Sequence, residues 1–437
     1  MKTLIKNIHI LNPHQKPFLG SLLIENDKIK KIFKGDSRRS LYSAKAGYWN
    51  GKDFDKVIEG KGLHCFPGFI DLHCHLREPG FEDCETIESG SRAAAAGGFT
   101  TICCMPNTNP VNDHPQVTRL LQQKIKNSSV IKVFPIGAIS EGLEGKRLAQ
   151  IGLCVDEGII AISDDGKCIS STSFMAKALA YSRQFDIPVV VHAEDPSLVY
   201  EYGIHTGRRA SLLGLKGSPA LAEEVIVARD IVLAERLKAR LHIAHVTSWQ
   251  SVEYIKHAKE RGVKVTAEVC PHHLLLTEKA TEDFNTLAKV APPLRSEKHR
   301  AALRHALKTD VIDCIATDHA PWSEKYKDLP FVEAACGIAG FETAFSLSYE
   351  LVQEGVLSLP KLISKLTVEP AKIFGLPKPE IKENSAADLV LVNLEQKYKI
   401  DTKNFLSKSK NTPFEGKSVK GKVKYTFCNG QLVYSDQ

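Results

Sequence analysis

Long hydrophobic runs are missing from this sequence. The longest apolar runs, such as 187–192 and 389–392, are far shorter than the roughly 18 residues that a membrane span needs. The first seven residues alternate charged and apolar side chains, and they contain no hydrophobic region of the signal-peptide type. We therefore expect a cytoplasmic protein that does not bind a membrane.

A cysteine framework is also missing. The 11 cysteines are odd in number, and none are spaced as Cys-x-x-Cys, the pattern of structural zinc ribbons. Several lie in apolar, strand-like segments, namely Cys103, Cys104, Cys154 and Cys314. This pattern predicts reduced thiols in a hydrophobic core and argues against disulfides.

A strong excess of one charge is absent too. The 58 basic and 51 acidic residues give a formal charge of +7, and no basic run concentrates it. That balance favours a small anionic substrate over a nucleic acid. With 43% hydrophobic and 25% charged residues, the 437-residue chain has the composition of a globular protein with a large core.

Short apolar runs alternate with amphipathic stretches through most of the chain. The eight apolar runs are 64–75, 99–105, 130–139, 158–165, 187–194, 239–247, 263–273 and 311–319. Stretches of helical periodicity between and after them are 85–98, 115–126, 173–185, 219–238, 249–262, 296–309, 342–354 and 359–374. Eight strand-helix repeats predict an α/β fold, a (β/α)8 TIM-like barrel, with a doubly wound open sheet as the alternative.

The two ends of the chain have a different pattern. Residues 3–11 and 21–33 resemble strands, and the polar stretch 34–53 resembles a loop. Near the C-terminus, 387–393 and 423–433 also resemble strands, with Asn429-Gly430 as a type I′ hairpin signal, while 401–421 is predicted to be a surface loop. We expect residues 1–60 and 376–437 to form one small β domain beside a barrel of residues 61–375.

Metal-binding side chains recur where the predicted barrel strands end. His73 and His75 alternate along the first strand and so point to the same side. Later strand ends carry Asp164 and Asp165, His192, His245, His272 and His273, and Asp318. Active sites of such barrels lie at these strand ends.

Imidazoles and carboxylates without a thiolate favour zinc or another first-row divalent ion. A site with an open coordination position lowers the pKa of bound water, which suits hydrolysis, and Asp318 can hold the metal and carry a proton. Alternation along the strand does not choose between Asp164 and Asp165.

Six segments together resemble the class I, bacterial type of dihydroorotase, a family of the amidohydrolase superfamily. They are Gly-Phe-Ile-Asp-Leu-His-Cys-His-Leu-Arg-Glu-Pro-Gly at 68–80, Met-Pro-Asn-Thr-Asn-Pro at 105–110, Ser-Asp-Asp-Gly at 163–166, His-Ala-Glu-Asp at 192–195, Glu-Val-Cys-Pro-His-His-Leu-Leu-Leu-Thr at 268–277 and Ala-Thr-Asp-His-Ala-Pro at 316–321. The resemblance runs nearly end to end and in the same order. It implies reversible hydrolysis of dihydroorotate to N-carbamoyl-L-aspartate in pyrimidine biosynthesis.

The resemblance also implies roles for single residues. His73 and His75 resemble ligands of one zinc ion, His192 and His245 ligands of a second, Asp165 a bridging ligand, and Asp318 a metal-bound general acid and base. One or two zinc ions per subunit are implied, with a zinc-bound hydroxide as the nucleophile. The implied substrate-binding positions are His75, Arg77, Asn107, Ala291, Trp322, Cys336 and Gly337, of which Arg77 and Asn107 would clamp a carboxylate.

Two of these positions depart from the family pattern. Ala291 stands where relatives often have Asn, and Trp322 stands where they commonly have a substrate-binding His. The indole Nε1–H can donate one hydrogen bond but carries no charge. We therefore expect Trp322→His to hold or improve kcat/KM for dihydroorotate.

Two other functions remain open at this point. An allantoinase or a dihydropyrimidinase-like enzyme hydrolyses related cyclic amides, but such enzymes typically carry a bridging lysine on the fourth strand, and 158–166 contains no lysine. A non-catalytic scaffold for aspartate transcarbamoylase would tolerate the loss of metal ligands, and none is lost here. The resemblance further implies association with that transcarbamoylase or self-association.

Overall fold

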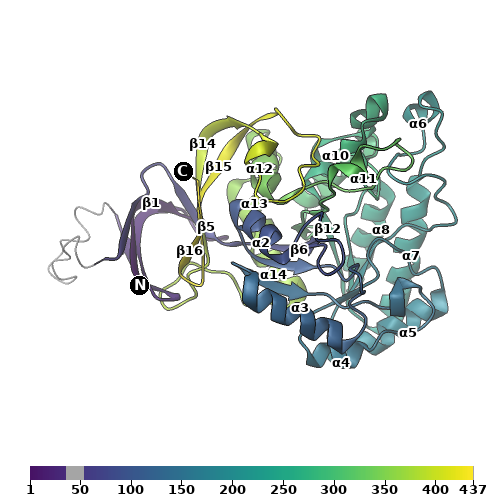
Figure 1. Ribbon diagram of the computed structural model, residues 1–437, viewed down its shortest axis with the longest axis horizontal. Helices are drawn as coiled ribbons and strands as arrows, with labels where there is room; N and C mark the ends of the chain where they lie inside the picture. The colour runs from purple at the N-terminus through teal and green to yellow at the C-terminus, as the bar shows by residue number, and fades with distance from the viewer. Residues whose placement is uncertain (36–53, 437) are drawn as a thin grey trace.

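The computed structural model describes residues 1–35 and 54–436, which form a barrel and an adjoining β-sheet (Figure 1). The predicted loop at 34–53 falls almost wholly outside the described residues. No helix in the described part of the chain is long and apolar enough to cross a membrane.

Eight parallel strands form the barrel, as the alternating sequence pattern predicts. They are β6 (Phe69–Cys74), β7 (Phe99–Cys104), β8 (Lys132–Pro135), β9 (Ile162–Ser163), β10 (Val189–Val191), β11 (Leu241–Ile243), β12 (Val265–Val269) and β13 (Cys314–Ile315). Regular pairing runs from β6 to β8 and from β9 to β13. Parallel bridges Gly137–Ile162 and Cys74–His319 join the two sheets at both edges and close the barrel.

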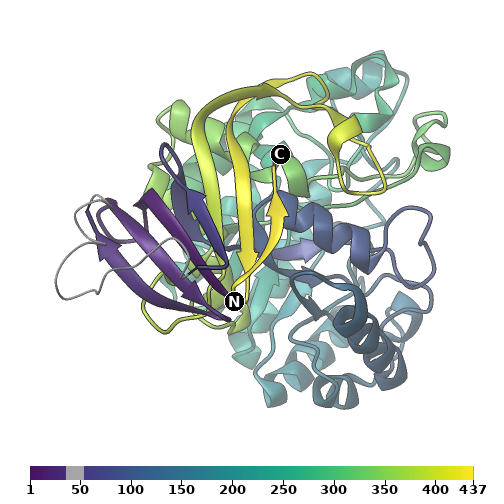
Figure 2. The same cartoon turned by 60° about the vertical axis from the view of Figure 1, so that its left-hand side comes forward.

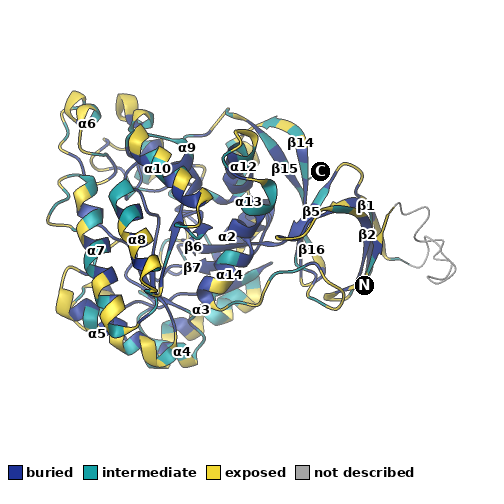
Figure 3. Cartoon of the chain, turned by 180° about the vertical axis from the view of Figure 1, so that it is seen from behind, coloured by how far each residue is buried: buried dark blue, intermediate teal, exposed yellow. Residues whose placement is uncertain are grey.

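Helices surround the strands on the outside. They are α2 (Ile87–Ala96), α3 (Pro115–Ser128), α4 (Ile151–Asp156), α5 (Thr172–Ser182), α6 (Arg208–Leu212), α7 (Ala220–Leu237), α8 (Trp249–Glu260), α9 (Pro271–Leu275), α10 (Glu297–Lys308), α11 (Glu324–Lys327), α12 (Ala344–Gln353), α13 (Leu359–Leu366) and α14 (Val368–Phe374). Figure 3 shows their inner faces buried and their outer faces exposed. The predicted helix at 359–374 is divided in two at Thr367.

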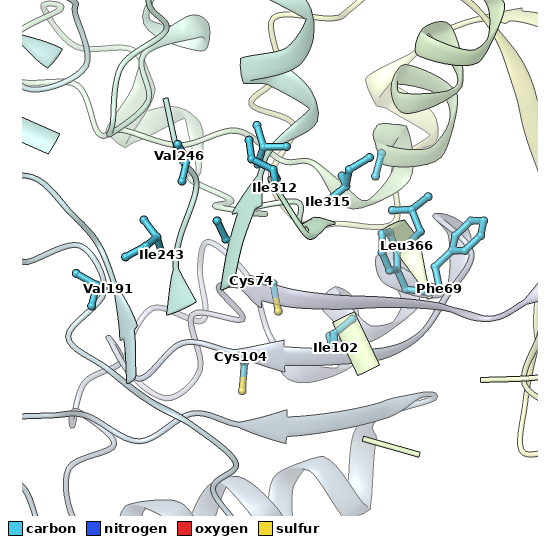
Figure 4. Packing of buried hydrophobic residues seen from close by; sticks show 14 of the residues in the cluster. Phe69, Cys74, Ile102, Cys104, Val191, Ile243, Val246, Ile312, Ile315 and Leu366 are labelled. Atoms are coloured by element: carbon cyan, nitrogen blue, oxygen red, sulfur yellow. The ribbon is translucent and has the colours of Figure 1, made fainter. Parts of the chain in front are cut away.

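The sequence explains these elements locally. β10 is a run of three valines that are buried on both faces, which is typical of a parallel strand covered by helices. α2 begins at a capping box, in which Thr86 and Ser89 satisfy each other's backbone N–H groups. Apolar side chains such as Val191, Ile243 and Val246 then pack between strands and helices (Figure 4).

A second sheet contains strands from both ends of the chain (Figure 2). Its strands are β1 (Lys2–Ile10), β2 (Phe18–Glu25), β3 (Lys28–Lys34), β4 (Lys56–Glu59), β5 (His64–Pro67), β14 (Leu389–Lys399), β15 (Ser418–Cys428) and β16 (Gln431–Ser435). The order is β16-β15-β14-β5-β1-β2-β3, with β4 beside β1. β5 pairs with both β1 and β14, so it joins the N-terminal strands to the C-terminal ones. The expected small β domain is therefore present.

The C-terminal part confirms one local prediction and corrects another. Asn429 and Gly430 both have positive φ between β15 and β16, as a type I′ turn requires. The stretch 401–421 is not wholly a surface loop, because β15 already begins at Ser418 and because Ser407, Ser409 and Asn411 are buried. Ser407 Oγ donates to Glu85 and Ser409 Oγ donates to the Cys84 carbonyl oxygen, so polar side chains fasten this segment to the barrel.

A candidate metal centre

Two groups of three ligand-type side chains meet at the C-terminal end of the barrel and share one residue. The first group is His73, His75 and Asp165, and the second is Asp165, His192 and His245; within each group the potential ligand atoms lie within 4.8 Å of one another. All five side chains are buried. One carboxylate between two imidazole pairs is the arrangement that a bridged pair of metal ions requires.

The distances place Asp165 between the two pairs. Its Oδ1 lies 3.3 Å from His73 Nε2 and 3.6 Å from His245 Nε2, and its Oδ2 lies 3.4 Å from His75 Nε2. His192 Nδ1 lies 3.7 Å from the same Oδ1. Strand alternation alone does not decide whether Asp164 or Asp165 is the shared ligand. The distances favour Asp165.

Asp164 has a different place in the structure. Its carboxylate accepts hydrogen bonds from the backbone N–H groups of Ile139 and Ser140 and from the Ser140 hydroxyl. The side chain thus ties the loop after β8 to the end of β9. Its oxygens are used by these donors of the protein.

Asp318 approaches the first group from the loop after β13. Its Oδ1 lies 3.2 Å from His75 Nε2 and 3.6 Å from His73 Nε2. Asp318 has a φ of 44°, His245 a φ of 32° and Arg77 a φ of 60°, all in the left-handed region that non-glycine residues rarely adopt. Such backbone strain gathers at functional sites, where the surrounding structure holds it in place.

Opposing effects determine the charges in this cluster. Burial alone would raise the pKa of Asp165, but the neighbouring imidazoles of His73, His192 and His245 outweigh it and hold that pKa well below its usual range. Burial likewise opposes charge on His192, while Asp165 and Glu194 raise its pKa to about 10. A buried carboxylate surrounded by imidazoles stays ionised, which is the state that binds a cation.

Unpaired atoms indicate that the cluster fits a metal. His73 Nε2, Asp165 Oδ1 and His245 Nδ1 are buried and have no hydrogen-bond partner among the described residues. Two of these three atoms, His73 Nε2 and Asp165 Oδ1, face each other across 3.3 Å. Leaving buried polar atoms without partners is costly unless a ligand satisfies them, and imidazole and carboxylate donors suit a divalent first-row ion.

Side chains behind the cluster orient the imidazoles. Glu268, at the end of β12, lies 2.7 Å from His73 Nδ1 and 3.0 Å from His242 Nε2. Asn107 Oδ1 lies 2.9 Å from His75 Nδ1. Such contacts fix the orientation of a ligand histidine and leave its other nitrogen for the metal.

The sequence analysis assigns no role to Glu268, although this residue begins the family-like segment 268–277. Asp71 was missed as well; it accepts hydrogen bonds from the Thr317 backbone N–H and hydroxyl. Strand alternation places Asp71 on the same side as His73 and His75, and this signal was available in the sequence. Glu194, whose Oε2 lies 3.4 Å from His192 Nε2, follows His192 by two residues in the predicted run 187–194, so the same alternation was available for it.

A cavity of about 520 Å³ opens above the cluster. All seven predicted substrate-binding residues line it. Lys167, Tyr202 and Lys289 also line it and were not predicted. The structure therefore brings together the residues that the sequence analysis selected.

Arg77 lies in the wall of this cavity and is 6% exposed. Its Nε donates to the Pro321 carbonyl oxygen at 3.0 Å, and no carboxylate among the described residues lies within ion-pairing distance of its guanidinium group. Burial lowers the pKa of Arg77 to about 10, so the group remains charged at neutral pH. A buried guanidinium without a protein carboxylate is suited to a carboxylate ligand.

Trp322 differs from the expectation that its indole donates to the substrate. Its Nε1–H donates to the Cys336 carbonyl oxygen at 2.9 Å, and its ring lies 3.9 Å from the Arg77 guanidinium carbon. The indole therefore supports Arg77 by a cation–π contact and fixes a neighbouring loop. Its hydrogen-bond donor is already used by the protein.

Comparisons with known proteins show which family this chain is similar to. Residues 62–251 match the family model described as dihydro-orotase-like. The chain is 46% identical to a dihydroorotase of Caldicellulosiruptor saccharolyticus over 99% of this chain and 98% of that protein, and 43% identical to one of Syntrophus aciditrophicus over the full length of both.

Solved structures show the same architecture. The dihydropyrimidinase of Brevibacillus agri superposes with a TM-score of 0.84 at 25% identity, covering 100% of this chain and 95% of that one. An L-hydantoinase of Arthrobacter aurescens superposes with a TM-score of 0.86 at 23% identity, covering 99% of this chain and 96% of that one, and shows the fold alone.

Proposed function

This chain belongs to the dihydroorotase family, and from that premise we propose how its own residues carry out the reversible hydrolysis of dihydroorotate to N-carbamoyl-L-aspartate. It is a metal-dependent cyclic amidohydrolase with relatives of that activity along its whole length. The observation that carries the assignment of residues is the shared carboxylate, Asp165, between two imidazole pairs beneath a cavity that contains an unpaired arginine.

Zinc is the metal that we propose. His73 and His75 would hold one ion, His192 and His245 the other, with Asp165 between them and Asp318 completing the first site. Four imidazoles and two carboxylates without a thiolate suit zinc. Bound metal would supply Lewis acidity that lowers the pKa of a water molecule and polarises the amide carbonyl.

Asp318 is the residue that we assign to proton transfer. It lies beside His75 at 3.2 Å and lines the cavity, so its carboxylate can reach a water molecule and a ring amide bound there. In hydrolysis Asp318 takes the proton of the attacking water and delivers it to the leaving amide nitrogen. In ring closure the same carboxylate takes a proton from the carbamoyl nitrogen.

Arg77 and Asn107 orient the substrate in this proposal. The guanidinium has free donors toward the cavity and binds the carboxylate of dihydroorotate. The Asn107 amide oxygen is used by His75, and its NH2 group donates to the Asp165 carbonyl oxygen at 3.5 Å, so one N–H is left for the substrate. Ala291, Cys336 and Gly337 line the cavity, and their backbone groups complete the binding surface.

Substrate preference tests this proposal most directly. The purified enzyme is assayed with dihydroorotate, allantoin and hydantoin, and its metal content is measured by mass spectrometry. Turnover of dihydroorotate at least a hundredfold above the others, with one or two zinc ions per chain, is the expected result. Preference for a cyclic amide that lacks a carboxylate would replace dihydroorotate with a dihydropyrimidinase-like substrate and remove the role of Arg77.

Association is proposed as well, either with aspartate transcarbamoylase or with a second copy of this chain, and so is a cytoplasmic location. The family resemblance supports both. Light scattering of the purified protein, alone and with the transcarbamoylase, tests the association. A monomer whose activity does not change when the transcarbamoylase is added would remove it.

A further inference from the structure

An irregular segment, residues 331–337, forms one wall of the substrate cavity. Val332, Ala334, Cys336 and Gly337 of this segment line the cavity. No helix or strand includes any of its residues, so backbone pairing of regular secondary structure does not hold it in place. Its position depends on contacts with other parts of the chain.

Two buried lysines make five of those contacts. The others include hydrogen bonds from the Ala335 and Gly337 N–H groups to the Tyr326 and Lys289 carbonyl oxygens, and one from Asn411 Nδ2 to the Gly337 carbonyl oxygen. Lys289 is 2% exposed, and its Nζ donates to the carbonyl oxygens of Phe331, Val332 and Ala334 at 2.6, 2.9 and 2.7 Å. Lys327 is 4% exposed, and its Nζ donates to the carbonyl oxygens of Ala335 and Gly337 at 2.8 and 3.2 Å and to that of Lys289 at 3.5 Å.

Neither ammonium group has an acidic partner among the described residues. A buried charge without a counter-ion is costly, and burial lowers the pKa of Lys327 to about 8. At neutral pH most molecules still carry this charge. Each Nζ contacts three carbonyl oxygens, which only the charged ammonium form can satisfy, so two buried positive charges stand beside a cavity whose proposed ligand is an anion.

The number of donors limits what these lysines can do. An ammonium group has three N–H donors, and each lysine directs its Nζ at three backbone carbonyl oxygens. No donor is left for a substrate, although Lys289 lines the cavity. The lysines must act through the segment that they hold and through their charge.

The contacts also account for the carbonyl oxygens of the segment. The two lysines and the Trp322 indole donate to six carbonyl oxygens of the segment, those of residues 331, 332, 334, 335, 336 and 337. The Cys336 N–H is donated to no acceptor among the described residues. Since these carbonyl oxygens already have donors, this N–H is the backbone group of Cys336 that remains for a ligand in the cavity.

We propose that Lys289 and Lys327 are positioning residues that hold segment 331–337 so that the Cys336 N–H binds an oxygen of the anionic substrate, while their charges favour that anion. The inference rests on the proposed function, since it takes dihydroorotate as the ligand. It assigns to two lysines outside the candidate metal centre a role in substrate affinity and none in the chemical step.

Lys327→Met tests the proposal most cleanly, because Lys327 does not line the cavity. Methionine fills similar volume without donors or charge. We expect KM for dihydroorotate to rise at least tenfold, with kcat within threefold of the parent and zinc content unchanged; Lys289→Met should behave alike. Lys325→Met is the matched control, because the Lys325 side chain is 62% exposed on the same helix, and both constants should stay unchanged.

An unchanged KM in Lys327→Met, or a fall in kcat without a rise in KM, would overturn the proposal. Lys327→Gln, which keeps two N–H donors, replaces the Met variant if that variant does not fold, and it should raise KM by a smaller factor.

Limited chymotrypsin digestion tests the position of the segment without substrate. Cleavage between residues 328 and 338 should be faster in Lys327→Met and Lys289→Met than in the parent. Equal cleavage rates would contradict the proposal that the two lysines hold segment 331–337. A parent enzyme that does not turn over dihydroorotate would instead contradict the proposed function. The digestion result would then decide whether the lysines hold segment 331–337.

Discussion

The Asp318 carboxylate contacts the candidate metal ligands and also lines the substrate cavity, so it can serve both the metal and proton transfer. We predict that Asp318→Asn lowers kcat for dihydroorotate about 10³-fold, because the amide cannot accept the proton that the reaction moves. The five other ligand side chains remain, so zinc content and the circular dichroism spectrum should be unchanged. Asp328→Asn, at an exposed carboxylate directly after α11, is the control. Near-normal turnover by Asp318→Asn would move proton transfer to another residue.

Trp322 gives opposite expectations from sequence and from structure. The sequence suggests that Trp322→His holds or improves kcat/KM for dihydroorotate, but the indole supports the Arg77 guanidinium at 3.9 Å and donates to the Cys336 carbonyl oxygen. Since a cation–π contact is worth about 0.5–2 kcal/mol, we predict that Trp322→His raises KM for dihydroorotate about three- to tenfold with a smaller change in kcat. Trp322→Phe keeps a ring for Arg77 and should raise KM less. Steady-state kinetics decides, and an improved kcat/KM in the His variant would restore the first expectation.

Among the elements, helix α7 contains a carboxylate on its buried face. Asp230 is 0% exposed, accepts a hydrogen bond from Arg229 Nε at 2.8 Å, and leaves its Oδ2 without a partner among the described residues. Burial raises the pKa of Asp230 to about 6. Because the folded state binds this proton more tightly than the unfolded state, the group costs stability as pH rises from about 4 to about 6, and the full cost remains at higher pH.

We therefore predict that Asp230→Asn, which keeps the acceptor for Arg229, is more stable than the parent at pH 7.5 by about 2 kcal/mol. The advantage should shrink toward zero near pH 4. Melting temperatures of both proteins across this pH range check the prediction. Glu235→Gln, at an exposed ion pair on the same helix, should change stability little at any pH. A pH-independent difference for Asp230→Asn would contradict the assigned titration.

At the scale of the whole molecule, the candidate centre connects distant parts of the barrel. Its side chains come from the ends of β6, β10 and β11 and from the loops after β9 and β13. A ligand that binds only the folded state adds to stability, so we predict that chelation lowers Tm by several degrees and abolishes turnover, and that added zinc restores both. His73→Ala should show a much smaller Tm response to chelator. A Tm that is insensitive to chelation in the parent would indicate that metal does not link these strands.

The sequence by itself determined the barrel and most of the candidate site. Eight apolar runs set the strands, and His73 and His75 followed from alternation along the first of them. Ligand residues at several other strand ends could be grouped without a structure because the C-terminal ends of parallel barrel strands meet at one face. The family resemblance then chose Asp165 and supplied Arg77 and Asn107.

Only the tertiary structure decided which donor faces which acceptor. Asp164 and Asp165 are neighbours in the chain, and contacts with Ser140 and with His73 separate their roles. The indole N–H of Trp322 is used by Cys336, and Lys289 and Lys327 hold the cavity wall through carbonyl groups. Local patterns report periodicity and polarity, whereas these contacts depend on backbone direction and on chain segments brought together by folding, and no periodicity in the sequence records either.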